Sequence, residues 1–308
     1  MRNTKATAIR FTIALLLCTL PLEYSPAQQV NTIDWKPVEQ ALGKAGSMQP
    51  GDVYKVSFPR NDLKVSVAGV ELKPALALGT WVAFKQMGEM TVVMGDLVLT
   101  ETEVIPVLSK LQEGGVDTTA LHNHVLNESP RVMYMHIHAM GDAVAIARAI
   151  HDALAVTKTP FAASPSPATA ELGIDTKQID QIMGQSGKVN GGVYQFSVAR
   201  ADEITDTAMT DGHTMVIPPA MGVAQAINFQ PTSPGKAAIT GDFVLLAGEV
   251  TPVMKALREN GIAVTAVHSH MLTENPRLFF MHFWANDDAL KLARGLRAGL
   301  DKVNVRRQ

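Results

Sequence analysis

Four of the nine histidines lie close together, on two short runs separated by a turn. The first run carries His122 and His124, and the second carries His136 and His138. Side chains two apart on a β-strand share one face, so the members of each pair point the same way. If the runs pair as a hairpin centred on Pro130, His124 faces His136 and His122 faces His138, with Cβ atoms about 4.5–5.5 Å apart. Four imidazoles at that spacing could bind a divalent transition metal ion such as zinc or copper.

The same block occurs a second time, at a constant offset from the first. Three of its histidines recur as His268, His270 and His282, whereas Trp284 stands where the first block has its fourth histidine. Three histidine ligands leave a coordination position for water or substrate, and four tend to close a site. The second block is therefore the better candidate for an open metal site with Trp284 as a wall. His213, present only in the second copy, could add a ligand, although a histidine in a turn is more often solvated.

A glutamate and an arginine accompany the histidines at each hairpin tip. They are Glu128 with Arg131 and Glu274 with Arg277. A carboxylate beside a metal ion can act as the general base for a bound water, and the arginines could hold an anionic ligand through forked hydrogen bonds. Alternatively, each Glu–Arg pair only fixes its loop, and the histidines form a hydrogen-bonded polar layer between packed domains.

The histidine block belongs to a longer internal repeat. Gly95 and Asp96 recur as Gly241 and Asp242, and earlier glycines match at slightly smaller offsets. Such regular spacing indicates a tandem duplication. We expect the first repeat at 33–155, a linker rich in proline, alanine and serine at 156–173, and the second repeat at 174–305.

Each repeat shows the same order of expected elements. A short helix precedes several strands, an amphipathic helix follows, and the histidine hairpin leads into a last helix that begins after Asp142 or Asp288. This mixture predicts an α+β fold: two tandem copies of a unit with a mostly antiparallel sheet and helices on one face. The residues expected on the helix-covered face of the first hairpin are Leu121, Met133, Met135 and Ile137. The histidines would then lie on the opposite face.

Residues 1–27 have the pattern of a secretory signal peptide. A basic start is followed by an apolar run too short to span a bilayer and by small residues ending at Ala27. Cleavage there would remove Cys18, the only cysteine, so we expect neither disulfides nor thiolate ligands. The expected location is the periplasm or the outside of the cell, with no membrane attachment after cleavage.

The composition limits the partners that the mature protein could bind. The formal net charge is −2, the isoelectric point is near 6.5 and 46% of residues are hydrophobic. These values are typical of a well-cored soluble protein and provide no basic surface for nucleic acid.

Several of these segments together resemble a known family. Met94-Gly-Asp-Leu-Val-Leu, Ala120-Leu-His-Asn-His, Glu128-Ser-Pro-Arg and Met135-His are similar to segments of the LppY/LpqO-like exported bacterial proteins, a domain of unknown function. The resemblance covers both repeats. It implies export but brings no activity or cofactor with it, and the lipid-attachment cysteine of lipoprotein relatives is missing from this chain.

The sequence supports two functional hypotheses. In the first, the protein is an exported metal-binding protein, and could be a metal-dependent hydrolase or lyase with Glu274 or Glu128 as base. In the second, it is a non-catalytic binding protein for metal or for a small anionic ligand, with Arg131, Arg277 and Trp284 as ligand contacts.

Overall fold

The computed structural model describes residues 33–162, 172–207 and 214–306. A compact unit begins at Trp35 and contains both repeats. The predicted signal peptide, residues 163–171 of the predicted linker and His213 lie outside the described residues.

The first repeat combines helices and strands in the expected order. Its elements are α1 (Lys36–Leu42), β1 (Ser47–Gln49), β2 (Val53–Pro59), β3 (Ser66–Val67), β4 (Val70–Glu71), α2 (Pro74–Ala77), β5 (Gly79–Met87), β6 (Met90–Thr100), α3 (Glu101–Glu113), β7 (Asp117–His122), β8 (Glu128–Ser129), β9 (Val132–Gly141) and α4 (Ala143–Ala155).

The second repeat follows the same plan. Its elements are α5 (Thr176–Met183), β10 (Lys188–Asn190), β11 (Val193–Ala199), β12 (Thr205–Asp206), β13 (Met215–Val216), η1 (Pro219–Met221), β14 (Ala224–Ser233), β15 (Lys236–Leu245), α6 (Ala247–Glu259), β16 (Ala263–His268), β17 (Glu274–Asn275), β18 (Phe279–Asp288) and α7 (Ala289–Leu300).

Each repeat forms a six-stranded antiparallel sheet. The strand orders are β1-β2-β5-β6-β9-β7 and β10-β11-β14-β15-β18-β16, which are the same order in the two copies. A small three-stranded sheet in each repeat joins β8 or β17 to two short strands. The predicted α+β fold and the predicted duplication are therefore confirmed.

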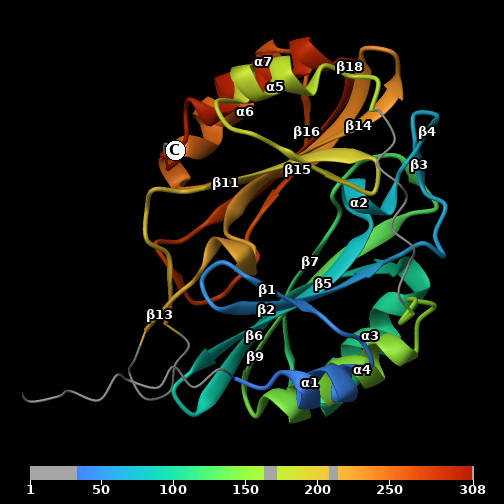
Figure 1. The fold of residues 1–308 in the computed structure, drawn as a ribbon, viewed down its shortest axis with the longest axis vertical. Helices are drawn as coiled ribbons and strands as arrows, with labels where there is room; N and C mark the ends of the chain where they lie inside the picture. Colours follow the sequence, from blue (N-terminus) through green and yellow to red (C-terminus); the bar gives the residue numbers. More distant parts are fainter. Residues whose placement is uncertain (1–32, 163–171, 208–213, 307–308) are drawn as a thin grey trace, which may run out of the picture. The chain divides into compact units, whose positions relative to one another are not determined.

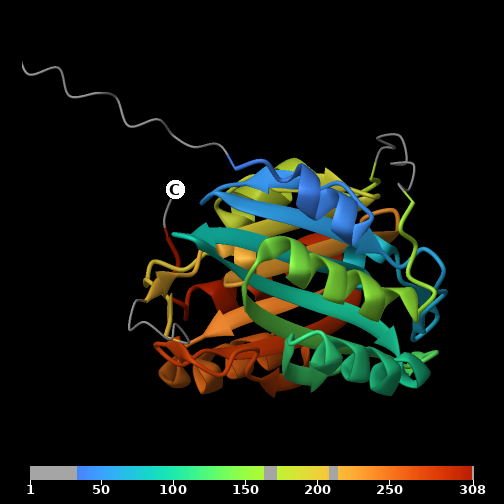
Figure 2. The same cartoon turned by 90° about the horizontal axis from the view of Figure 1, so that it is seen from below.

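The helices cover one face of each large sheet. Figure 1 shows α5, α6 and α7 outside one sheet and α1, α3 and α4 outside the other, with both sheets between them. Figure 2 looks onto the helix layer of the first repeat, with α1 in blue and α4 in green in front of the strands. Met135 and Ile137 point into this helix-side core, as their alternation with the histidines predicts. Leu121 was expected there too, but it is 43% exposed because β7 is an edge strand and Leu121 lies near its end.

The other faces of the two sheets pack against each other. One apolar cluster joins Val53 and Met94 of the first repeat to Phe280 and Met221 of the second. Another joins Tyr134 and Leu78 to Val193, with Trp284 packed against it. Hydrogen bonds also cross the interface: Gln195 Nε2 donates to the carbonyl of Ala75 at 2.7 Å. The histidine-bearing faces of both repeats are therefore turned toward each other.

The predicted hairpin register is wrong. Ala120 lies opposite His136, His122 opposite Tyr134 and Asp117 opposite His138. Two features displace the register from one centred on Pro130. A bulge interrupts β7 between Thr118 and Ala120, and the connection is a long excursion in which β8 pairs with β3 instead of forming a tight turn. His124 consequently lies beyond the last paired residue of β7.

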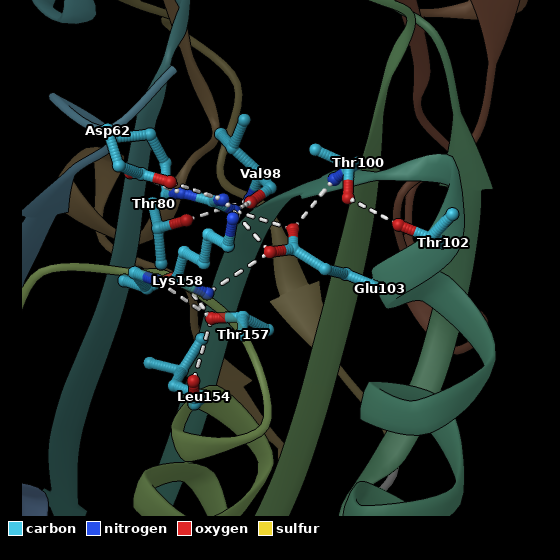
Figure 3. A network of polar contacts seen from close by, with 11 residues as sticks. Asp62, Thr80, Val98, Thr100, Thr102, Glu103, Leu154, Thr157 and Lys158 are labelled. Carbon is cyan, nitrogen blue, oxygen red and sulfur yellow. Dashed lines mark hydrogen bonds and ion pairs between the residues drawn. The ribbon is translucent and has the colours of Figure 1, made fainter.

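A buried arginine ties the end of the sheet to α3 in the first repeat. The Arg60 side chain is fully buried and donates hydrogen bonds to the Val98 carbonyl at 2.6 Å and to Glu103 at 2.9 Å. Figure 3 shows Glu103 at the centre of this network, where it also accepts from the backbone of Thr100 at 2.8 Å and of Lys158 at 3.1 Å. Arg200 and Glu249 repeat the arrangement in the second copy.

Replacing Glu103 with Ala should destabilise the protein by about 1–3 kcal/mol, because Arg60 and the amides of Thr100 and Lys158 lose an acceptor while Asp62 remains as the charge partner of Arg60. Glu101→Ala is the matched control, because Glu101 lies in the same helix turn with its side chain 63% exposed and should change stability by less than about 0.5 kcal/mol. Urea unfolding measures both values. Equal effects for the two variants would contradict the assigned role of Glu103.

Acid should weaken the same network. Burial alone would raise the pKa of Glu103, but its hydrogen bonds from Arg60, Thr100 and Lys158 lower that pKa below the ordinary value of 4.5. The unfolded chain therefore binds this proton at higher pH than the folded one. The stabilisation is present above pH 4.5 and is lost as the pH falls through the folded pKa, so wild type and Glu103→Ala should converge in stability in acid.

Candidate metal centre

Six histidines, three from each repeat, meet in the interface between the two sheets. They are His122, His124, His136, His268, His270 and His282. Each close ring pair joins one repeat to the other: the ring centroids are 3.6 Å apart for His122 and His268, 3.5 Å for His136 and His270, and 3.9 Å for His124 and His282. The two histidine blocks that the sequence separates thus form a single cluster, which we call the histidine cluster.

The contacts around the cluster follow the internal repeat. His124 stacks on Tyr134 at 3.3 Å, and its counterpart His270 stacks on Phe280 at 3.6 Å. The hydroxyl of Thr119 donates to the carbonyl of His270 at 2.6 Å, and the counterpart threonine of the second repeat does the same for His124. These paired contacts show that the two repeats approach each other with near two-fold equivalence at the cluster.

The sheets place the histidines by strand position. His136 and His282 occupy the middle of β9 and β18, which are internal strands, so both side chains are buried. His122 and His268 are the last residues of β7 and β16. His124 and His270 follow in the loops, where they are held against the rings of Tyr134 and Phe280.

His138 and its counterpart Trp284, both predicted as site residues, lie outside the cluster. His138 is two residues along β9 from His136 and contacts Asp206 of the second repeat, Nε2 to Oδ2, at 2.8 Å. Asp206 also accepts from the hydroxyl of Thr273 at 2.8 Å. Trp284, the counterpart of His138, packs with the apolar cluster that contains Tyr134 and Leu78.

Two groups of histidines within the cluster have nitrogen atoms close enough together to bind one metal ion. The first is His122, His268, His270 and His282, and the second is His122, His124 and His136. In each group one ring nitrogen from every member lies within 4.8 Å of the others, and His122 belongs to both. Buried imidazoles in this arrangement could hold a metal ion.

Most nitrogens at the centre have no hydrogen-bond partner among the described residues. This holds for Nε2 of His122, His124, His136 and His282. The other nitrogen of His122 faces the Asn123 carbonyl at 3.2 Å, and that of His282 faces the Gly241 carbonyl at 3.0 Å. Backbone acceptors at Nδ1 favour the tautomer whose Nε2 carries the free lone pair. His268 and His270 face each other through Nε2 at 2.8 Å.

One aspartate from each repeat borders the cluster. Asp242 Oδ1 lies 2.8 Å from Nδ1 of His282. Asp96, its counterpart on β6, lies 3.9 Å from Nε2 of both His136 and His124. Both aspartates belong to the Gly-Asp pairs that mark the internal repeat, and only the fold brings them beside the rings.

Burial keeps most of the rings uncharged. It lowers the pKa of His122 to about 4 and that of His268 to about 2, in both cases helped by neighbouring histidines. The pKa values of His124, His136 and His270 are also well below 6.5 for the same reasons. A neutral imidazole is the form that binds a metal ion.

The two aspartates influence the charges of the cluster differently. Burial alone would lower the pKa of His282, but the charge of Asp242 and its contact with Nδ1 raise that pKa above 6.5. Burial and the charge of Asp242 raise the pKa of Asp96 to about 8.

A small cavity touches one side of the cluster. Its volume is about 20 Å³, and its lining includes His136, His138, His270, Met94 and Met271. This is enough for one water-sized species. On the opposite side, the counterparts of His138 and Met271 are Trp284 and Val125. Both contribute to a packed apolar cluster.

The glutamates of the hairpin tips lie outside both histidine groups. Glu274 accepts hydrogen bonds from the backbone of Leu278 at 3.0 Å and from Arg277 at 3.1 Å, so it closes its own loop. The Glu128 side chain is 1% exposed and lies 4.0 Å from Arg131. Both arginine side chains are more than half exposed.

Comparison with known proteins places the chain in a family. The Domain of Unknown Function (DUF1259) matches residues 36–156 and again residues 177–302. The chain belongs to this family and contains two copies of its domain. No match is found among curated proteins.

Three solved structures are similar at low identity, and two of them, PduB and MSM0271, are microcompartment shell proteins. The trimeric PduB is 12% identical over 85% of this chain and 91% of that chain, with a TM-score of 0.21. EtuB from Clostridium kluyveri is 10% identical over 84% and 91%, with a TM-score of 0.20. The double-ringed trimeric MSM0271 is 11% identical over 70% and 84%, with a TM-score of 0.19. TM-scores this low carry no structural or functional inference.

Replacing Glu274 with Ala should reduce stability by about 1–3 kcal/mol, because the buried amide of Leu278 loses its acceptor. If the glutamate only closes the loop, the variant should retain the metal content of wild type. Urea unfolding and elemental analysis of the same sample measure the two quantities. An unchanged stability together with altered metal content would instead favour a role for Glu274 at the metal.

Proposed function

We propose that the protein is an exported transition-metal-binding protein, and that the histidine cluster is its metal site. The observation that carries this proposal is the set of buried imidazoles whose unpartnered nitrogens converge. Leaving a buried polar atom without a partner costs about 1–3 kcal/mol, and here several such atoms lie together. A metal ion would satisfy them at once.

Zinc or copper fits the donor set best. Imidazole nitrogen suits both ions, and four histidines match the tetrahedral geometry that zinc prefers. The low pKa values of most of the rings mean that little proton release is needed before an ion binds at neutral pH.

The site supports binding better than turnover of a large substrate. The cavity that touches the histidines accommodates only a water-sized species, and Glu274 is engaged in its own loop. A hydrolase or lyase would need a path for substrate between the two packed sheets. We therefore favour metal uptake or storage over hydrolysis. The exposed Arg131 and Arg277 leave a small anionic ligand as the alternative.

His282→Gln should lower the bound metal or weaken its affinity at least tenfold, since His282 is a buried member of the four-histidine group. His138→Gln is the matched control, because His138 lies on the hairpin strand β9 but contacts Asp206. Elemental mass spectrometry of untagged protein, prepared without chelator, measures both. Wild type that holds no metal after incubation with zinc and with copper would overturn the proposal and redirect the search to anionic ligands.

Export is a separate part of the proposal. It is supported by the basic, apolar and small-residue order of residues 1–27 and by the resemblance to the LppY/LpqO-like exported proteins. None of the helices in the described part of the chain is long and apolar enough to cross a membrane.

The full chain expressed in a bacterium should be recovered outside the cytoplasm with its N-terminus at Gln28. Fractionation and intact mass measure this outcome. A Leu15→Arg variant, which breaks the apolar run, should accumulate uncut in the cytoplasm. Uncut wild type in the cytoplasm would exclude export by this route.

A further inference from the structure

A single metal ion leaves part of the histidine cluster unexplained. If one tetrahedral ion takes His122, His268, His270 and His282, the buried atoms still without hydrogen-bond partners in the described part of the protein include two ring nitrogens of the other histidines and one carboxylate oxygen beside them. These three atoms are Nε2 of His124, Nε2 of His136 and Oδ1 of Asp96. All three belong to the first repeat, and they border one another.

The spacing of these three donors suits a shared ion rather than hydrogen bonds. Asp96 Oδ1 lies 3.9 Å from His136 Nε2, and Asp96 Oδ2 lies 3.9 Å from His124 Nε2. Both distances are too long for a hydrogen bond, whose donor and acceptor lie within about 3.2 Å. Ligand bonds of about 2.0–2.2 Å allow two donors on one ion to lie at most about 4.2 Å apart. Each histidine nitrogen thus lies close enough to one Asp96 oxygen to share an ion with it, and ring nitrogens of His124 and His136 lie within 4.8 Å of each other.

The counterpart aspartate has a different environment. Asp242 contacts Nδ1 of His282 at 2.8 Å, which leaves Nε2 of that ring for the four-histidine group. This is the usual position of a carboxylate that orients a histidine ligand from behind. The equivalent Asp96 instead faces the free nitrogens themselves. Of these two equivalent aspartates, only Asp96 faces ring nitrogens that have no hydrogen-bond partner among the described residues.

The lysine whose charge acts on Asp96 does not occupy this position. This residue, Lys55, donates to the Ala220 carbonyl at 3.2 Å and lies 3.8 Å over the ring of Trp81.

We propose that the centre is binuclear, with a second divalent transition metal ion bound by His124, His136 and Asp96. This rests on the proposed metal-binding function. His122 belongs to both histidine groups and can serve only one ion through Nε2. The cluster and Asp96 together offer seven donor side chains, so one ion has four protein ligands and the other three. The ion with three retains a coordination position for a water-sized ligand. Two histidines and one carboxylate suit zinc or ferrous iron better than copper(I).

The test is the metal stoichiometry of the whole mature chain after saturation with zinc and removal of excess, measured by native mass spectrometry. Wild type should hold two ions, and Asp96→Asn should hold one. His138→Gln is the matched control: His138 lies on the same strand as His136 but contacts Asp206, so this variant should retain two. His136→Gln should also hold one. Near-ultraviolet circular dichroism of each variant confirms the native fold, and Asp96→Ser replaces Asp96→Asn if the latter unfolds.

The outcomes separate the inference from the proposed function. One ion in wild type that is unaffected by Asp96→Asn would overturn the second site and leave the metal-binding function intact. Absence of metal from wild type would overturn both. Loss of one ion in both Asp96→Asn and the control His138→Gln would overturn the assignment of Asp96 as a ligand. Cobalt-loaded wild type should also show weakened paramagnetic resonance from two coupled ions, and this coupling should be absent in Asp96→Asn.

Discussion

The burial of six imidazoles between two sheets is the constraint on which the rest of this structure depends. A polar ring in an apolar interface must find a partner for each nitrogen, or the interface is weakened. Backbone carbonyls of Asn123 and Gly241 satisfy one nitrogen of His122 and His282, but the opposite nitrogens converge on the centre. Rings of Tyr134 and Phe280 hold the loop histidines in place from outside. The interface therefore contains a layer of histidines at a position where packing alone would favour apolar side chains.

Duplication explains how such a layer forms, because equivalent residues of the two repeats meet. The positions at which the repeats differ make the two sides of the layer unequal. Equivalent contacts, such as those of Thr119 and its counterpart, bring the repeats together as near equals. The copies then diverge at a few positions. Trp284 packs against an apolar cluster on one side, where His138 lines a cavity on the other. Asp96 and Asp242 also contact different atoms of their histidines. One side of the interface is thus sealed and the other retains a small space.

The scaffold outside the interface keeps these positions fixed. Each sheet is covered by helices on the face away from the histidines, and a buried arginine locks the sheet to the following helix in both repeats. The histidine strands β9 and β18 are internal, with hydrogen-bonded neighbours on both sides. A site built on internal strands is held more precisely than one on loops. His124 and His270, which lie in loops, depend on ring stacking and on threonine hydrogen bonds to their carbonyls.

The amino-acid sequence by itself determined the duplication, the α+β class, the helix-covered face marked by Met135 and Ile137, and the residue types that could bind metal. These features follow from local periodicity and from comparison of one half of the chain with the other. Only the tertiary structure decided that the two histidine blocks form one cluster, that His138 and Trp284 lie outside it, and that Asp96 faces free nitrogens. The hairpin register was missed because a bulge and the pairing of β8 with β3 are set by contacts far apart in the sequence. Strand alternation shows which face a histidine occupies, but not what that face packs against, since this depends on non-local burial.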